Sequence, residues 1–279
     1  MFYQRIEKPR QQKFLQSAFT ATLLLVVGLT AIAQEPVSKE QIDDKLTEVV
    51  KLGEAIVENT TTHRMSKDYV GNALNCTSCH LDNGRHEKAG TFLGTATAYP
   101  AWSPRENRVI TLEDRVLNCF MRSCNGIRPP LGSEVSVAVT AYITSLSQGQ
   151  SLRMNSKRPV GPGAIKLLAV KPDQADISRG ASLYHSRCAE CHQKDGQGDK
   201  DNPPVWGERS YNDGAGLSSV ENLAAWLKVA MPLDDTDLTD QQALDIAAYV
   251  NSQKRPHFDL LKHLPTKEKL GEYNASPTK

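Results

Sequence analysis

The chain has 279 residues, which is enough for two small domains or one large one. Charged residues make up 23% of it and the formal net charge is only +1, so the charge balance gives no indication of a nucleic-acid-binding protein or of an acidic tail. The informative part of the composition is the placement of the six cysteines.

The first 33 residues have the pattern of a secretory signal peptide. A stretch with four Lys and Arg residues precedes an apolar run over residues 18–33, which ends in the small residues A-I-A. The run is short for a membrane span, and an uncleaved anchor is the alternative. Cleavage leaves 29 basic and 31 acidic residues and no second apolar span. We therefore expect a soluble mature protein that does not span a membrane and works in an oxidising compartment.

Two copies of one short motif follow along the chain. Residues 76–80 read C-T-S-C-H and residues 188–192 read C-A-E-C-H, and C-x-x-C-H is typical of c-type haem attachment. In this pattern the two thiols bind the haem covalently and the histidine becomes the proximal iron ligand. A disulfide or a zinc half-site is the alternative for each pair. The residues concerned are Cys76, Cys79, His80, Cys188, Cys191 and His192.

Similar helices surround the two motifs. Apolar residues at helical spacing predict helices over residues 39–59 and 176–187 before the motifs, and over 133–148 and 239–253 after them. This internal duplication resembles the class I cytochrome c fold twice over, in which an N-terminal and a C-terminal helix cross. Gly53 and Gly180 would let these helices approach closely, with Tyr142 and Tyr249 packed at the crossings. We predict an all-α protein of two cytochrome c-like domains, each with one covalent haem c.

The segment between the halves reads as a linker. It contains three prolines and several glycines, so we expect it to be largely non-helical and long enough to wrap over the surface. The predicted organisation is a signal peptide (1–33), an N-terminal cytochrome c domain (34–148), a linker (149–173), a C-terminal cytochrome c domain (174–264) and a flexible tail (265–279).

Each haem needs a candidate for its sixth ligand. Met231 lies 39 residues after His192, in A-M-P-L at the end of a predicted helix over 220–230, as in the distal loop of small cytochromes c. At the same distance after His80 stands Cys119, whose thiolate would lower the haem potential. Met121 is the competing ligand in the first half, and a core methionine is the alternative for Met231.

The segment around Cys119 carries a second chemical signal. Residues 113–124 are predicted to be helical, which places Arg115, Cys119 and Ser123 on one side of the helix. Cys124 is turned away by about 140° and lies roughly 8–9 Å from Cys119 between Cα atoms. A disulfide needs Cα atoms closer than about 7 Å, so we expect Cys124 to be buried as a small apolar residue.

A thiol flanked by guanidiniums suggests an anion site. Nearby cations favour the nucleophilic thiolate and bind the oxygens of a small dianion through forked hydrogen bonds. Arg105 and Arg108, in S-P-R-E-N-R at 103–108, are close enough in sequence to reach the same pocket. The alternative is that these arginines bind haem propionates or solvent, and for Arg108 this interpretation is preferred.

At this point the sequence resembles a known family, the dihaem thiosulfate dehydrogenases. The resemblance rests on the two C-x-x-C-H motifs together with Y-P-A-W-S-P-R (99–105), T-L-E-D-R-V (111–116) and C-F-M-R-S-x-N-G (119–126), and it covers nearly all of the mature chain. Such enzymes couple two thiosulfates to tetrathionate, and some members run the reverse reaction. The chain departs from the family where Cys124 replaces a common Met and where Ala230 replaces a Lys that some members use as an alternative ligand; Lys228 is a weaker candidate for that role.

The resemblance implies specific roles. Haem 1, held by His80 and Cys119, would be the catalytic haem, with Arg105, Arg115 and Ser123 around thiosulfate. Haem 2, with His192 and Met231 as ligands, would pass electrons to an external acceptor such as a small cytochrome c or a high-potential iron-sulfur protein. The predicted signal peptide indicates a periplasmic location, and the charge balance gives no indication of a nucleic-acid partner.

Two other functions are compatible with parts of the pattern. A non-catalytic dihaem electron shuttle, or a subunit of a sulfur-oxidising complex, would also use His/Cys haems, but it has no need of an anion pocket beside a buried haem. A dihaem peroxidase needs an open or displaceable peroxide site, which a cysteine ligand beside arginines matches poorly.

Overall fold

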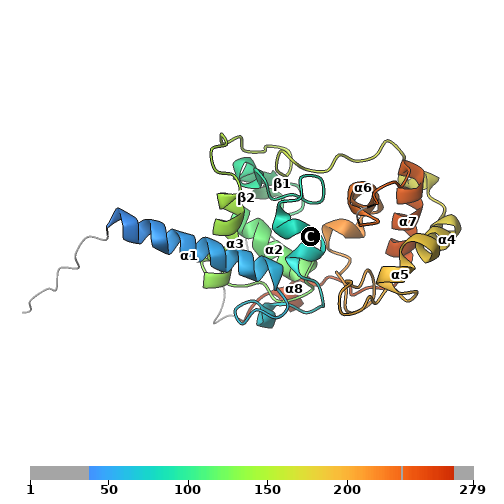
Figure 1. The fold of residues 1–279 in the computed structure, drawn as a ribbon, viewed down its shortest axis with the longest axis horizontal. Coiled ribbons are helices and arrows are strands. Elements are labelled where there is room, and N and C mark those ends of the chain that lie inside the picture. Colours follow the sequence, from blue (N-terminus) through green and yellow to red (C-terminus); the bar gives the residue numbers. More distant parts are fainter. Residues whose placement is uncertain (1–37, 234, 267–279) are drawn as a thin grey trace, which may run out of the picture. The chain divides into compact units, whose positions relative to one another are not determined.

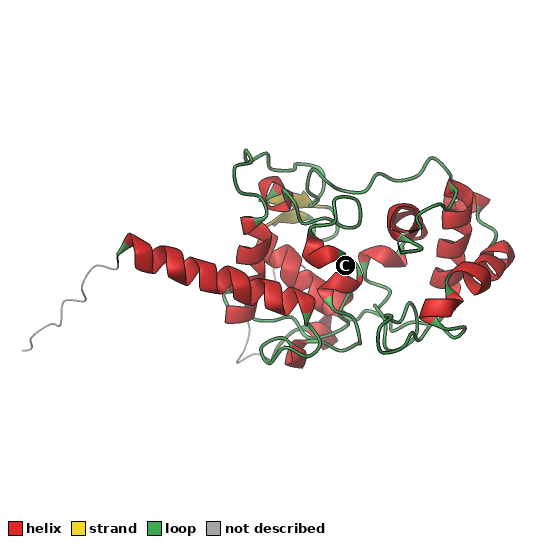
Figure 2. Ribbon diagram, viewed as in Figure 1, coloured by secondary structure: helices red, strands yellow, loops and turns green. Residues whose placement is uncertain are grey.

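The computed structural model describes residues 38–233 and 235–266. The predicted signal peptide and nearly all of the predicted tail lie outside the described residues. In this part of the chain no helix is long and apolar enough to cross a membrane. The fold is helical, with one small two-stranded sheet (Figures 1 and 2).

The helices occur in two sets, one around each motif. The first half contains α1 (Lys39–Glu58), α2 (Leu112–Arg122) and α3 (Glu134–Ser145). The second half contains α4 (Ile177–Arg187), α5 (Ala189–His192), α6 (Val220–Ala230), α7 (Asp240–Ser252) and α8 (Leu260–His263). Short 3-10 turns and loops connect them, and the linker crosses between the halves as a largely non-helical segment (Figure 1).

The predicted helix crossings are confirmed in both halves. Helix α1 packs on α3 and α4 packs on α7. A Cβ atom on Gly53 would collide with the carbonyl group of Ala138, and one on Gly180 would collide with the carbonyl group of Asp245. Glycine is therefore required at both crossings because the helix backbones touch there. Tyr142 and Tyr249 lie beside these glycines, as expected.

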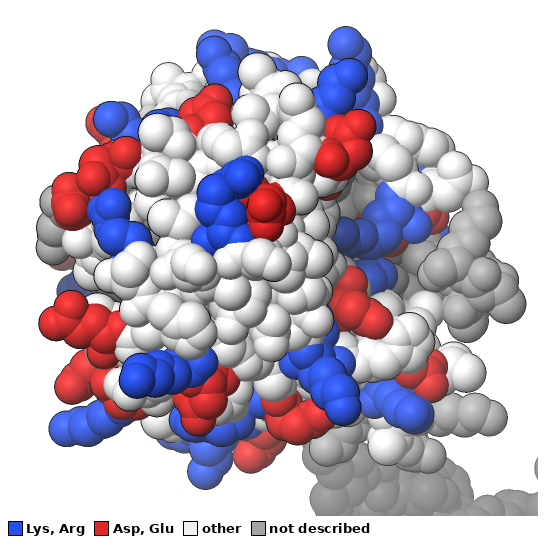
Figure 3. Space-filling model, turned by 90° about the vertical axis from the view of Figure 1, so that its right-hand side faces the viewer, with Lys and Arg blue, Asp and Glu red and all other residues white. Residues whose placement is uncertain are grey.

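Each half has its own hydrophobic core. The first is built from α1, α2 and α3, with Ile56, Phe120 and Tyr142 almost fully buried. The second is built from α4, α6 and α7, with Tyr184 and Leu244 at its centre. Basic and acidic side chains are interspersed on the face of the molecule that includes α4 and α7 (Figure 3), so this face carries no block of one sign.

The small sheet was not anticipated from the sequence. Strands β1 (Ala101–Ser103) and β2 (Arg108–Ile110) pair antiparallel, with Ala101 opposite Ile110. Three residues per strand give too short a pattern to distinguish a strand from a loop. Arg105, one of the predicted site residues, lies in the turn between these strands.

Candidate active site

A cavity of about 360 Å³ brings the first motif and α2 together. Cys76, Cys79 and His80 line it from one direction, while Arg115 and Cys119 line it from α2. The remaining wall is mainly apolar. The predicted residue Ser123 also lines this cavity. Cys124 is buried as expected, but it lines the same cavity instead of facing away from it.

Hydrogen bonds from neighbouring residues hold the first motif in place. The hydroxyl of Thr60 accepts a hydrogen bond from the Cys76 N–H at 3.0 Å and donates to the Cys76 sulfur at 3.3 Å. The Nδ1 atom of His80 is hydrogen-bonded to the carbonyl oxygen of Gly90. That bond orients the ring and leaves Nε2 for an iron ion. Burial lowers the pKa of His80 to about 4, so the imidazole is neutral and able to act as a ligand.

Helix α2 carries the central contact of the site. The guanidinium of Arg115 donates a hydrogen bond from Nη1 to the sulfur of Cys119 at 2.9 Å. The charge of Cys119 raises the pKa of Arg115 further above its ordinary value. Since the two residues are four apart, this contact is the helical neighbour pair that the sequence predicted. Met121, the competing ligand, is fully buried and is not among the residues that line the cavity.

The beginning of α2 is anchored by buried polar contacts. Thr111 caps the helix by accepting the N–H of Asp114 at 3.1 Å. The Asp114 carboxylate in turn pairs with the guanidinium of Arg128 at 2.9 Å, with both side chains almost completely buried. Both contacts fix the helix that presents Arg115 and Cys119.

The end of α2 is held by residues from both halves. Asn212, from the second half, donates from Nδ2 to the carbonyl oxygen of Met121 at 2.9 Å. Asn72 donates from Nδ2 to the carbonyl oxygens of Ser123 at 2.8 Å and Ser210 at 3.0 Å. The last carbonyl groups of a helix have no partners within it, so these side chains supply the missing donors. None of the six cysteines in the described residues forms a disulfide, and Cys124 is buried, as expected.

The arginines near α2 create a positive region. Arg105 is exposed and does not line the cavity itself, but partial desolvation and the charges of Arg122 and Arg115 lower its pKa. Arg122 is buried, with its guanidinium 4.0 Å from the centre of the Phe258 ring. Its Nε atom has no hydrogen-bond partner in the described structure. The positive charges of Arg105, Arg115 and Arg122 repel one another, and this repulsion favours binding of an anion near them.

The linker, which is long enough to wrap over the surface, forms part of the wall of the cavity that Cys119 lines. Residues 158–161, 163–165 and 167 line the cavity, and the Tyr99 hydroxyl donates to the carbonyl oxygen of Pro159 at 2.8 Å. Arg158 adds another cation to this lining. The second half also contributes, through Trp226 and neighbouring residues of α6. Sequence reasoning missed these contributions, since no motif marks them.

The second motif has the same local arrangement. The Nδ1 atom of His192 is hydrogen-bonded to the carbonyl oxygen of Pro203 at 2.8 Å. Met231 is the residue at which α6 ends, and it packs against the core of the second half. The amine of Lys228 is occupied by the carbonyl oxygen of Leu238 and lies 3.8 Å from the Asp240 carboxylate. Cys188 is half-buried and Cys191 is exposed.

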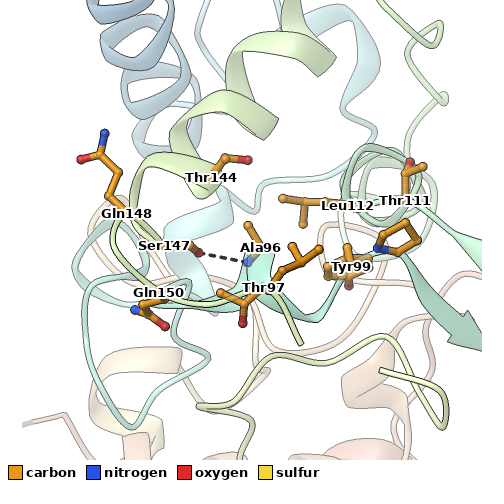
Figure 4. Close-up of a pocket in the computed structure, with 11 residues that line it drawn as sticks. Ala96, Thr97, Tyr99, Thr111, Leu112, Thr144, Ser147, Gln148 and Gln150 are labelled. Carbon is orange, nitrogen blue, oxygen red and sulfur yellow. Dashed lines mark hydrogen bonds between the residues drawn. The ribbon is translucent and has the colours of Figure 1, made fainter. Parts of the chain in front are cut away.

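A second hollow shares Tyr99 and Leu112 with the cavity that Cys119 lines (Figure 4). It is formed by Tyr99, Leu112 and residues near the end of α3, and a hydrogen bond of 3.1 Å from the Ala96 N–H to Ser147 Oγ crosses its wall. No ionisable side chain other than the Tyr99 phenol lines it, so it offers no charge for an anion. The cavity that Cys119 lines differs in this respect, because Arg115 and Arg158 contribute to its wall.

Comparisons with known proteins agree with this geometry. Residues 67–152 match the SoxA/TsdA cytochrome c domain family, and residues 175–250 match the family described as cytochrome c oxidase, cbb3-type, subunit III. The chain is 37% identical to a thiosulfate dehydrogenase of Stutzerimonas stutzeri over 80% of this chain and 73% of that protein. The chain belongs to the thiosulfate dehydrogenase family.

Two further relatives support the same family. A thiosulfate dehydrogenase of Allochromatium vinosum is 36% identical over 87% of this chain and 94% of that protein. The solved thiosulfate dehydrogenase TsdBA of Marichromatium purpuratum superposes with a TM-score of 0.70 at 36% identity. That comparison covers 79% of this chain, which spans about half (48%) of the solved chain.

The residues present fit two covalent haem c groups, which the two cytochrome c domains of this family carry. Each C-x-x-C-H motif has its histidine Nδ1 engaged by a backbone carbonyl, and the first opens onto an apolar cavity. A zinc site is disfavoured, because the described residues contain no group of three or more His, Cys, Asp or Glu side chains that could hold a metal ion.

Proposed function

We propose that this protein joins two thiosulfate ions into tetrathionate in the periplasm and delivers the electrons to an external acceptor. The observation that carries the proposal is the 2.9 Å contact between the Arg115 guanidinium and the Cys119 sulfur, in a cavity lined by a haem-attachment motif. A non-catalytic electron shuttle has no use for such a pair, whereas an enzyme that binds sulfur dianions needs it.

The positive charges of the arginines would reduce the repulsion between two bound thiosulfate ions. Two thiosulfate dianions repel each other, and their approach requires concentrated positive charge. Arg115 lines the cavity, and Arg105 is close enough for the charges of Arg115 and Cys119 to affect its pKa. We assign Arg105 and Arg115 to binding the sulfonate oxygens, with the Ser123 hydroxyl as a further donor.

Cys119 has two proposed tasks. With haem 1 bound, Cys119 and His80 would be the residues that hold its iron, and the Cys119 thiolate would form a bond to the outer sulfur of one thiosulfate. That step removes two electrons and produces a Cys119 S-thiosulfonate. A second thiosulfate then attacks the outer sulfur, tetrathionate leaves, and the thiolate of Cys119 is restored. When bound, the haems supply the one-electron acceptors for this oxidation.

The second half has the role of electron exit. We assign Cys188 and Cys191 to covalent attachment of haem 2, whose iron His192 and Met231 would hold. The proposed acceptor is a small cytochrome c or a high-potential iron-sulfur protein, and the reverse reaction is allowed by the same chemistry. In this proposal the predicted domain over residues 34–148 would hold haem 1 and the predicted domain over residues 174–264 would hold haem 2.

The test uses the purified oxidised holoprotein under anaerobic conditions. Thiosulfate is added, the reduced-haem absorption band is followed, and tetrathionate is assayed. Fast reduction with tetrathionate formed supports the proposal. If both haems remain oxidised with thiosulfate, tetrathionate is added to the dithionite-reduced protein. Reoxidation then identifies an enzyme poised for reduction, and no reaction in either direction identifies an electron shuttle.

A matched variant tests the role of Cys119. Cys119→Ala is expected to abolish turnover while both haems remain covalently attached. Cys119→Met is expected to raise the potential of haem 1, because methionine ligation favours the ferrous state. An unchanged potential in Cys119→Met would refute the ligand assignment, and full activity of Cys119→Ala would refute the covalent step.

A further inference from the structure

Helix α6 is shared between the two haem sites. Leu223, Ala224 and Leu227 pack in the core of the second half. Trp226 also packs against that core, but it lines the cavity of the first half as well. The helix therefore presents side chains to both sites from one rigid element.

One hydrogen bond connects α6 to the first motif. The indole Nε1 of Trp226 donates to the carbonyl oxygen of Cys79 at 3.1 Å, across 147 residues of sequence. That carbonyl belongs to the peptide bond that joins Cys79 to His80. The Trp226 side chain is buried, with 8% of the residue exposed, so water does not compete strongly for this bond.

The other end of the same helix reaches the second site. The helix ends at Ala230 and is capped by Met231, five residues after Trp226, and the Met231 N–H donates to the carbonyl oxygen of Leu227 at 3.0 Å. Met231 follows the last helical residue directly, so its backbone position is tied to that of Trp226. A continuous path thus joins the Cys79–His80 peptide, the indole ring and the Met231 backbone.

We infer that Trp226 is a positioning residue that couples the two haem sites during electron transfer. Its hydrogen bond holds the Cys79–His80 peptide against α6, and its ring fills the space between the first motif and the second half with closely packed atoms. In the step concerned, one electron moves from haem 1, whose iron goes from ferrous to ferric, to haem 2, whose iron goes from ferric to ferrous. The inference depends on the two haems and not on the proposed tetrathionate chemistry.

Two separate effects follow from this placement. An N–H dipole directed at the Cys79 carbonyl places positive charge beside haem 1, which stabilises the electron-richer ferrous form and raises its potential. The packed Trp226 ring also fills space between the two halves, so an electron that moves between the haem sites crosses a shorter distance through empty space. Loss of the N–H should therefore lower the potential of haem 1, while loss of the whole ring should also slow electron transfer.

The experiment uses the holoprotein with Trp226→Phe and Trp226→Leu. The two haems are distinguished by their ferric EPR signals in redox titrations, and electron exchange between them is followed after flash reduction. Trp102→Phe is the matched control, because Trp102 lies in β1, and its hydrogen bond to the carbonyl oxygen of Asn155 is made by the backbone N–H, which the substitution keeps.

The expected results differ between the variants. Trp226→Phe should lower the potential of haem 1 and leave that of haem 2 unchanged, and Trp226→Leu should also slow electron exchange several-fold although the driving force towards haem 2 has increased. Trp102→Phe should change neither quantity. Wild-type potentials and exchange rates in both Trp226 variants would overturn the inference and leave Trp226 a residue of the core only. If Trp226→Leu does not retain both haems, Trp226→Phe alone decides through the potential of haem 1.

Discussion

The contact between Arg115 and Cys119 allows the sharpest prediction about activity. Arg115→Gln retains a polar side chain of moderate length but removes the positive charge and the forked donor. The lost interaction is a charge-assisted hydrogen bond of 2.9 Å inside a cavity. Hydrogen bonds to charged groups contribute about 1.5–3 kcal/mol. Since each 1.36 kcal/mol changes a rate about tenfold, we expect kcat/KM for thiosulfate to fall by about 10- to 150-fold.

The assay is steady-state turnover of thiosulfate with an artificial electron acceptor, together with tetrathionate formation. Arg115→Lys should retain part of the activity, because it keeps the charge but loses the planar fork. Arg108→Gln is the matched control: Arg108 is exposed on β2, and its replacement should leave kcat/KM unchanged. Absorption spectra of all variants must first show both haems attached.

One outcome would refute the reasoning. If Arg115→Gln binds both haems and turns over thiosulfate at the wild-type kcat/KM, the guanidinium has a structural role and the anion site lies elsewhere. An equal loss in Arg108→Gln would point to general surface electrostatics, and raising the salt concentration would then reduce the difference.

Three further predictions concern the framework. Gly53→Ala should lower the free energy of unfolding by about 1–3 kcal/mol through overpacking at the α1–α3 crossing, whereas Gly216→Ala, where a Cβ meets nothing within 4 Å, should have little effect; equal denaturation midpoints would contradict this. Asp245→Asn should destabilise the protein by about 1–2 kcal/mol near neutral pH. Burial alone would raise the pKa of Asp245, but hydrogen bonds from Arg179, the Asp176 N–H and Gln241 lower it below its ordinary value of 3.8. The stabilisation by the Asp245 carboxylate is therefore present above pH 3.8 and is lost as the pH falls below that value. A difference in stability between Asp245→Asn and wild type that persists in acid would refute the assignment. Asn212→Ala should reduce kcat/KM more than its cost of about 1–3 kcal/mol in stability explains, because it frees the end of α2 beside Ser123; unchanged kinetics in a destabilised variant would show that Asn212 acts only in folding.

The sequence by itself determined the local features of this protein. The two C-x-x-C-H motifs, the helices around them and the glycines at their crossings follow from spacing and periodicity, which are properties of short segments. The contact of Arg115 with Cys119 belongs to the same class, because residues four apart meet on any helix. The helical spacing also disfavours a disulfide between Cys119 and Cys124, and the two cysteines are free in the structure.

Only the tertiary structure decided which distant residues complete the site. Trp226 meets Cys79 across 147 positions and Asn212 meets Met121 across 91 positions, and no period or spacing in a single sequence encodes such pairs. The fold also placed Cys119 on the cavity and Met121 away from it. The sequence alone left both residues as candidate ligands, because only the packing around α2 decides which side of the helix faces the cavity. These contacts arise because the second half packs against α2 and the first motif, and helix packing of this kind depends on both surfaces together.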